Sequence, residues 1–233
     1  MKDTQTNKLR LGRLSRRIIQ HHLPLLAVLA FSTFFFYRSL PQKDVIWKLS
    51  FVTAYSALLL LVATLLIGPW KLLRGRRPAV SSDLRRDIGI WAGILGIIHT
   101  GVGLFVHLRG RPWLYFVYGK TERHHIVPLR HDLFGFSNDS GLIGTVILVL
   151  LLATSNDYSL RRFGRAKWKQ LQRWNYLLFA AVALHSFGYQ TIEKQRAPFV
   201  AVVIACVVIT LLLQIYGFRV NRAAIARQRL SKV

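Results

Sequence analysis

The chain has 233 residues, of which 52% are hydrophobic, and it carries 33 Lys and Arg against nine acidic residues, a formal net charge of +24. On a soluble protein such a charge would indicate nucleic-acid binding, with basic side chains gathered on one face. Here the basic residues instead lie in short tracts between long apolar blocks, which is typical of membrane proteins. We therefore expect no nucleic-acid partner.

Six apolar blocks follow one another along the chain, and most approach the roughly 20 residues that a helix needs to cross the hydrocarbon core. They cover residues 20–38, 47–69, 88–108, 140–155, 174–191 and 197–217. Uninterrupted apolar runs such as 58–62 lack the alternation that a barrel strand requires, so the blocks predict helices. The predicted fold class is all-α, a polytopic membrane helical bundle of six spanning helices in the lipid bilayer.

The Lys and Arg residues between the blocks are distributed unevenly over the two sides of this topology. Of the 33, 23 lie in the segments that would share one side, which are 1–19, 70–87, 156–173 and 218–233. The positive-inside rule places that side in the cytoplasm. We expect a multi-pass protein with both termini cytoplasmic, basic tails at 1–19 and 218–233, and a transmembrane domain at 20–217.

Two of the eight histidines, His99 and His185, lie well inside apolar blocks. His99 follows Arg86 by thirteen residues and His185 follows Arg173 by twelve, so at about 1.5 Å per residue they reach nearly the same depth. Two neutral imidazoles at one depth can take the iron of a six-coordinate haem b from opposite sides. The pair therefore predicts haem-iron axial ligands.

Small residues accompany both histidines on the same helix faces: Gly96 and Gly103 flank His99, and Gly188 follows His185. They would let a flat macrocycle approach, although they equally let helices pack on each other. The competing interpretation is that the two histidines hydrogen-bond to neighbouring helices. A zinc or copper site is disfavoured, because no Cys, Asp, Glu or Met lies at that depth to complete the shell.

Several short motifs occur in order between residues 48 and 217: Arg85-Arg-Asp-Ile-Gly, Ile97-Ile-His99, Gly141-Leu-Ile-Gly, Ala153-Thr-Ser-Asn-Asp157, Ser159-Leu-Arg-Arg with Gly164, Trp168-Lys-Gln-Leu-Gln-Arg, and Asn175-Tyr-Leu-Leu with His185. In this order and spacing the chain resembles the ferric reductase-like transmembrane domain family. It is most similar to short bacterial members, among them the haem-bearing membrane subunit of the periplasmic methionine sulfoxide reductase system.

The resemblance implies a haem b protein of the bacterial inner membrane that passes electrons across the bilayer, with His99 and His185 at the ligating positions. Electrons would come from a cytoplasmic flavoprotein, such as a flavin reductase, or from a quinol. They would go to a periplasmic reductase or to ferric iron. The sequence contains no G-x-G-x-x-G stretch, so we expect an oxidoreductase electron-transfer subunit without its own flavin or nicotinamide domain. Flavin or quinone is the candidate additional cofactor.

One haem is expected rather than two. Family members with a second haem have another His thirteen residues before the later ligand, and here Gln172 stands at that position. The alternative second sites are His107 with a loop histidine such as His131, or His21 with His22.

Two other classes of function stay open on the sequence alone. A transporter or channel could use the buried histidines, with Ser56, Thr64 and Thr100 as its few polar residues at mid-depth. If the protein were a structural assembly subunit without chemistry, the equal depth of the two histidines would be a coincidence. The colour of the purified protein distinguishes these from a haem carrier.

Overall fold

The computed structural model describes residues 12, 14–41, 44–75, 83–108, 110–119 and 128–230, so most of the predicted tail at 1–19 lies outside the described residues. Within these ranges the protein is helical, and its extended residues form a single isolated bridge between Val117 and Leu129. The elements are a π-helical turn η1 (Ile18–His22), α2 (Leu23–Ser39), α3 (Val45–Leu73), α4 (Asp83–Gly103), a 3₁₀ turn η2 (Pro112–Tyr115), α5 (Leu133–Ala153), α6 (Asp157–Gln172), α7 (Trp174–Ile192) and α8 (Ala197–Leu230).

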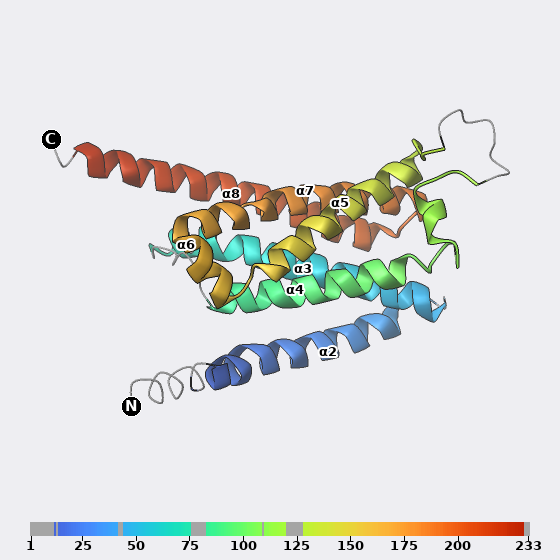
Figure 1. Ribbon diagram of the computed structural model, residues 1–233, viewed down its shortest axis with the longest axis horizontal. Coiled ribbons are helices and arrows are strands. Elements are labelled where there is room, and N and C mark those ends of the chain that lie inside the picture. Colours follow the sequence, from blue (N-terminus) through green and yellow to red (C-terminus); the bar gives the residue numbers. More distant parts are fainter. Residues whose placement is uncertain are drawn as a thin grey trace.

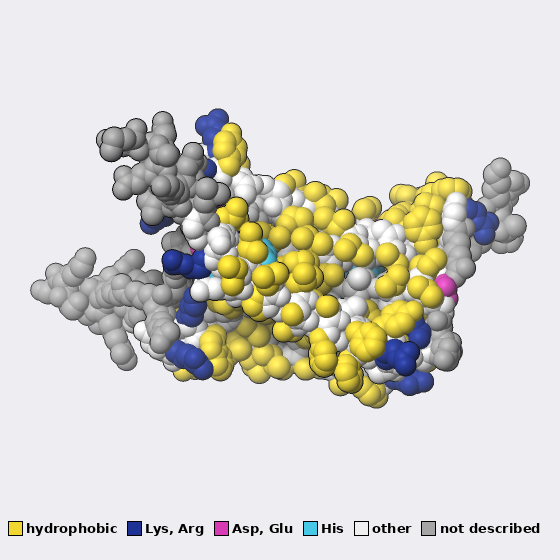
Figure 2. All heavy atoms as spheres, turned by 90° about the horizontal axis from the view of Figure 1, so that it is seen from below, with side chains coloured by type: hydrophobic (Ala, Val, Ile, Leu, Met, Phe, Trp, Pro, Cys, Tyr) yellow, Lys and Arg dark blue, Asp and Glu magenta, His cyan; other side chains and the backbone are white. Residues whose placement is uncertain are grey.

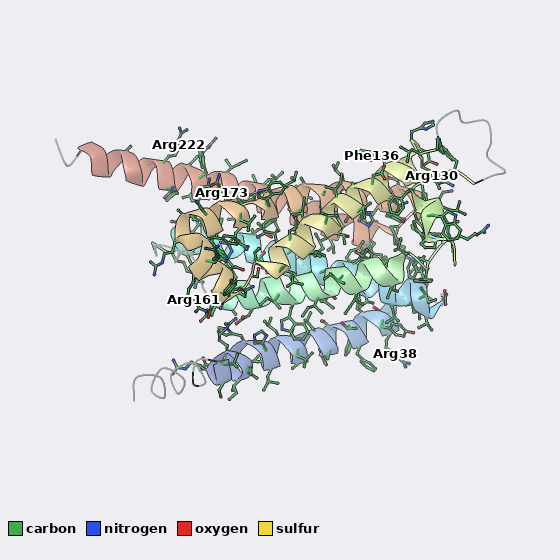
Figure 3. The ribbon with its side chains drawn as sticks, viewed as in Figure 1. Arg38, Arg130, Phe136, Arg161, Arg173 and Arg222 are labelled. Carbon is green, nitrogen blue, oxygen red and sulfur yellow. The ribbon has the colours of Figure 1, made fainter. Side chains whose placement is uncertain are left out.

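The long helices run side by side in one bundle (Figure 1). Turn η1 and the C-terminal part of α8 lie at one end, which we call the terminal end, and η2 lies at the other, the loop end. Helix α4 packs against α3, α7 packs against α5, and α8 packs against α3. Figure 3 shows Arg161, Arg173 and Arg222 at the terminal end, and Arg38 and Arg130 at the loop end.

Four helices are long and apolar enough to cross a membrane: Leu14–Ser39, Val45–Leu73, Leu133–Ala153 and Ala197–Ala223. Apolar side chains cover the middle of the molecule and Lys and Arg gather toward its ends (Figure 2). The all-α membrane prediction is confirmed for the described residues. The prediction of six spans is met only in part, because α4 and α7 form as helices but fall outside this apolar group. Helix α4 starts with four charged residues within its first five positions.

Two helix boundaries differ from the predicted blocks, and each has a local cause. Helix α5 begins at Leu133 rather than near 140, because the Asp132 carboxylate caps it by accepting a hydrogen bond from the Gly135 N–H at 2.7 Å. Helix α4 ends at Gly103 rather than near 108. The Tyr115 hydroxyl donates to the Gly103 carbonyl oxygen at 3.0 Å and thereby satisfies one of the last carbonyls of the helix.

The basic stretch between the fourth and fifth blocks forms helix α6, which the apolar pattern did not predict. Asn156 caps its start, and Gly164 breaks its course with φ 72°, in the left-handed region that glycine tolerates. Trp168 is the buried anchor of its second half, and its indole N–H donates to the Thr154 carbonyl at 3.0 Å. Helix α8 likewise continues past 217, to Leu230.

The main apolar core lies where α3, α4, α5, α7 and α8 meet. Leu65, Leu178 and Val203, from three different helices, are each at most 2% exposed. Cys206 belongs to the same cluster, so the single cysteine is a packing residue.

The first helix is attached to this core differently. No residue of α2 is buried along its length. At the loop end the ring of Phe36 meets Phe51 and Phe199, with centroids 5.8 Å apart in each case. At the terminal end Arg17 and His21 contact the carboxylate of Asp87 on α4. The first helix is therefore fixed by its two ends.

Candidate functional site

A cavity of about 300 Å³ lies inside the bundle between α3, α4, α5 and α7. This volume is at the lower end of the range for small-molecule sites, roughly 300–1,000 Å³. Its wall is mostly apolar, with Leu58, Leu61, Leu148 and Val182 among the residues that line it. Such a wall favours a largely apolar ligand held by a few polar groups.

His99 from α4 and His185 from α7 face each other across this cavity. Their ring centroids are 6.0 Å apart and the ring planes are inclined at 73°. Both imidazoles line the cavity. The structure therefore brings together the two histidines whose equal depth the sequence indicated.

The hydrogen bonds of the two rings fix which nitrogen carries the proton. Nδ1 of His99 lies 3.0 Å from the carbonyl oxygen of Ser50, and Nδ1 of His185 lies 2.8 Å from that of Ser137. A carbonyl oxygen can only accept, so each Nδ1 must be the N–H donor and each Nε2 keeps its lone pair. Among the described residues neither Nε2 has a hydrogen-bond partner. This is the tautomer of a metal-ligating imidazole.

The ring separation fits one metal ion between the two histidines. An imidazole nitrogen binds a metal at about 2 Å, and the ring centre lies roughly 1 Å further on, so two ligands on opposite sides of one ion place their centroids about 6 Å apart. The observed distance is 6.0 Å. Within the described residues no cluster of three or more His, Cys, Asp or Glu side chains could hold a metal ion. The pair therefore fits an ion whose remaining ligands come from a cofactor, as in haem.

Glycines around the cavity leave room for the two imidazole rings, but not every glycine that the sequence indicated lies at the cavity. A Cβ at Gly141 of α5 would lie 2.6 Å from Nδ1 of His185, so only glycine leaves room for that ring. Gly96 and Gly103 line the cavity, and a Cβ at Gly103 would lie 3.9 Å from Cε1 of His99. Gly188 does not line it. That glycine instead packs against Ser137, at the contact between α5 and α7.

A second polar group lies at the loop end of the cavity, around His107. Nε2 of His107 is 2.9 Å from Oε1 of Glu193, and the Trp47 indole N–H donates to the other Glu193 oxygen at 3.3 Å. Tyr189 stacks on His107, with centroids 6.0 Å apart and planes 25° apart. Gln190 also lines the cavity and is 8% exposed, and its side-chain oxygen has no hydrogen-bond partner among the described residues.

Glu193, Tyr189 and Gln190 were missed by the sequence reasoning. A signal existed: His185, Tyr189 and Glu193 are spaced by four residues and so share one face of α7. Without a structure, however, that spacing does not show that His107 meets this face.

The residues expected at a second site do not come together. His107 pairs with Glu193, while His131 is exposed and stands against the Tyr118 ring at 5.4 Å. Gln172 lies at the end of α6, and its side-chain oxygen accepts from Asn175 at 3.4 Å. These contacts of His107 and His131 thus involve different residues, and a second haem between them stays a prediction.

His21 and His22 are not among the residues that line the described cavity. Nδ1 of His21 lies 2.7 Å from Oδ2 of Asp87, and Nε2 of His22 lies 3.4 Å from Oδ1. Trp91 donates to the remaining nitrogen of His22 at 3.2 Å. Since both nitrogens of His22 have partners, this pair is not arranged to hold a haem.

The polar residues expected for a transport path are also separated. Thr100 lines the cavity and bonds to Thr145 at 3.0 Å. Thr64 donates to its own helix at Leu61, and Ser56 is absent from the cavity wall. The described residues therefore present no continuous polar path from these three positions.

Comparison with known proteins gives a distant similarity. No family model matches the chain, and no solved structure matches it. The chain is 27% identical over 157 residues, 62% of its length, to the protein-methionine-sulfoxide reductase heme-binding subunit MsrQ of Yersinia pseudotuberculosis serotype O:1b (strain IP 31758), and equally to that of Yersinia pestis (strain Pestoides F). The matched region spans 62% and 61% of those proteins. The chain is thus distantly related to MsrQ haem-binding subunits, while no family model matches to support the ferric reductase-like resemblance.

Proposed function

We propose that the protein is a membrane haem b carrier in which His99 and His185 are the axial ligands of one haem. The observation that carries this proposal is that both imidazoles line one mostly apolar cavity with ring centroids 6.0 Å apart, while each Nε2 has no hydrogen-bond partner among the described residues. Haem bound there would supply an iron that cycles between its ferric and ferrous states. The name of the MsrQ relatives supports this cofactor.

The surroundings of the two ligands support haem over a bare ion. The Ser50 and Ser137 carbonyls orient the rings and make each Nε2 a better electron donor. Zinc in a structural site takes four protein ligands and in a catalytic site three, whereas no three such side chains of the described residues come together here and only the pair His99 and His185 is placed to share an ion. The porphyrin would supply the other four nitrogens, and the apolar walls would exclude water.

Six spans with both termini in the cytoplasm complete the proposal, because α4 and α7 lie within the bundle beside helices that are apolar enough to span. With 21 and 19 residues, they are about 30 Å long, the thickness of the hydrocarbon core. The basic terminal end would then face the cytoplasm by the positive-inside rule. On the same basis we place the transmembrane haem-binding domain at 20–217.

The haem position suggests how electrons enter and leave. His99 lies twelve residues, about 18 Å along α4, from Asp87 at the terminal end, whereas the cavity reaches residues of the loop end such as Glu193. Electrons from a cytoplasmic flavoprotein or a quinol would leave at the loop end. The acceptor would be a periplasmic reductase, which the name of the MsrQ relatives favours, or ferric iron.

The test is the haem content of purified protein. His185→Ala should abolish the Soret absorbance and the haem detected by pyridine haemochrome, since one axial ligand is gone. His131→Ala, which changes an exposed histidine outside the cavity, is the matched control and should keep both signals. Haem retained in both His185→Ala and His99→Ala, or a colourless unaltered protein produced with haem supplied, would refute the proposal.

A further inference from the structure

His107 and Glu193 form an imidazole–carboxylate pair one aromatic ring away from the proposed haem ligand. The rings of His185 and Tyr189 have centroids 4.9 Å apart, and Tyr189 in turn stacks on His107. Along α7, Glu193 lies eight residues beyond His185, about 12 Å further toward the loop end. The pair therefore lies in the same cavity as the two facing imidazoles and close to the outer surface.

Most neighbours of His107 are uncharged aromatic residues, and its charged neighbour is Glu193. The Tyr115 hydroxyl oxygen, on η2, accepts a hydrogen bond from the His107 backbone N–H at 3.0 Å. The ring centroid of Phe134, on α5, lies 6.0 Å from that of His107. From α7 come Tyr189 and Glu193. Within the described ranges no other charged side chain contacts His107. Its Nε2 faces Glu193, so Nδ1 is the nitrogen that can gain a proton.

We propose that the His107–Glu193 pair takes up one proton when the cofactor between His99 and His185 gains one electron. An added electron makes this low-dielectric cavity more negative, and a positive imidazolium nearby compensates for that change. The electron comes from the external reductant and converts ferric to ferrous iron. The proton comes from water at the cavity mouth and forms a new N–H bond at Nδ1 of His107, so charge is balanced locally.

Thermodynamic linkage couples proton uptake by His107 to reduction of the haem, and this coupling can be measured. If reduction favours protonation, protonation favours reduction by the same free energy. The haem midpoint potential should then fall as pH rises across the range in which histidine titrates, about pH 5 to 8. For one proton per electron the slope reaches about 59 mV for each tenfold change in proton concentration. This inference rests on the proposed haem function.

The experiment is a potentiometric titration of the full-length, haem-loaded protein in detergent, followed at the haem absorbance at several pH values. Unaltered protein should show the slope, and His107→Gln should flatten it while keeping the Soret band. His131→Gln, an exposed histidine outside the cavity, should keep the slope. A potential that does not vary with pH in the unaltered protein, or an unchanged slope in His107→Gln, would overturn the inference.

A second variant covers the case in which His107→Gln fails to fold. Glu193→Gln removes the carboxylate that pairs with His107, so the dependence of the midpoint potential on pH should change. An unchanged dependence would count against the pair. Failure of the haem proposal itself gives a different result, because no variant and no unaltered protein would then show a Soret band.

Discussion

Asp87 and Glu193 are both carboxylates that meet histidines, at opposite ends of the bundle, yet their surroundings differ. Asp87 is 0% exposed and is contacted by Arg17, His21 and His22, all from the first helix. The Glu193 side chain is 14% exposed, lines the cavity and is contacted by His107 and Trp47. The comparison teaches that Asp87, fully buried among donors that include the permanent cation of Arg17, serves as an anchor, whereas Glu193 lies at the wall of a cavity.

The π-helical turn η1 explains why three donors can converge on Asp87. In an α-helix Arg17 and His21 would share a face, but His22 would be rotated away from it. The wider π turn, with its i→i+5 hydrogen bond from the Leu23 N–H to the Ile18 carbonyl, brings His22 over Arg17 as well. The π-helical turn thus places Arg17, His21 and His22 where all three can contact Asp87.

The largest expected effect is that of Asp87→Ala. It leaves the Arg17 guanidinium without its carboxylate in a partly buried place, which should cost about 3–5 kcal/mol of unfolding free energy. Thermal unfolding in detergent measures the loss, and the Soret band of protein that stays folded should not change. Asp139→Ala, at an exposed position on α5, is the control and should stay within about 0.5 kcal/mol. Equal losses in both variants would contradict the anchor role.

Glu193→Ala should have an intermediate effect. It removes the partner of His107 and Trp47, but the cavity lets water replace the lost contacts, so we expect about 1–3 kcal/mol. The same thermal assay compares it directly with Asp87→Ala. A loss as large as that of Asp87→Ala would show that the two carboxylates are equivalent anchors.

Arg17→Lys should have the smallest effect and sharpens the account of Asp87. The guanidinium reaches both carboxylate oxygens, through Nη2 and through Nε at 3.3 Å, and an ammonium group cannot reproduce this fork. Because the charge is kept, we expect only about 1 kcal/mol to be lost. Arg17→Ala gives the reference value. No difference between the Lys and Ala variants would mean that the two-point contact, rather than the charge, carries the stabilisation.

The apolar blocks were enough to predict the helices that carry the site. Counting from Arg86 and Arg173 also gave His99 and His185 similar depths, because rise per residue is nearly constant in a helix. Helix α6 escaped prediction because it is basic and contains no apolar block, and Trp168 is its one buried hydrophobic residue among those described. Helical spacing identifies neighbours on one helix but not contacts between helices, so His107 with Glu193 and His21 with Asp87 could not be read from the sequence.

The two carbonyls that orient the histidines belong to neither of the helices that carry them. Ser50 is on α3 and Ser137 is on α5, so α4 and α7 alone would hold imidazoles with free rotation and mixed tautomers. Correct presentation of both nitrogens requires all four helices to be docked first. Cofactor insertion should therefore be a late event in biogenesis, and the colour of the protein should report that the tertiary structure is complete.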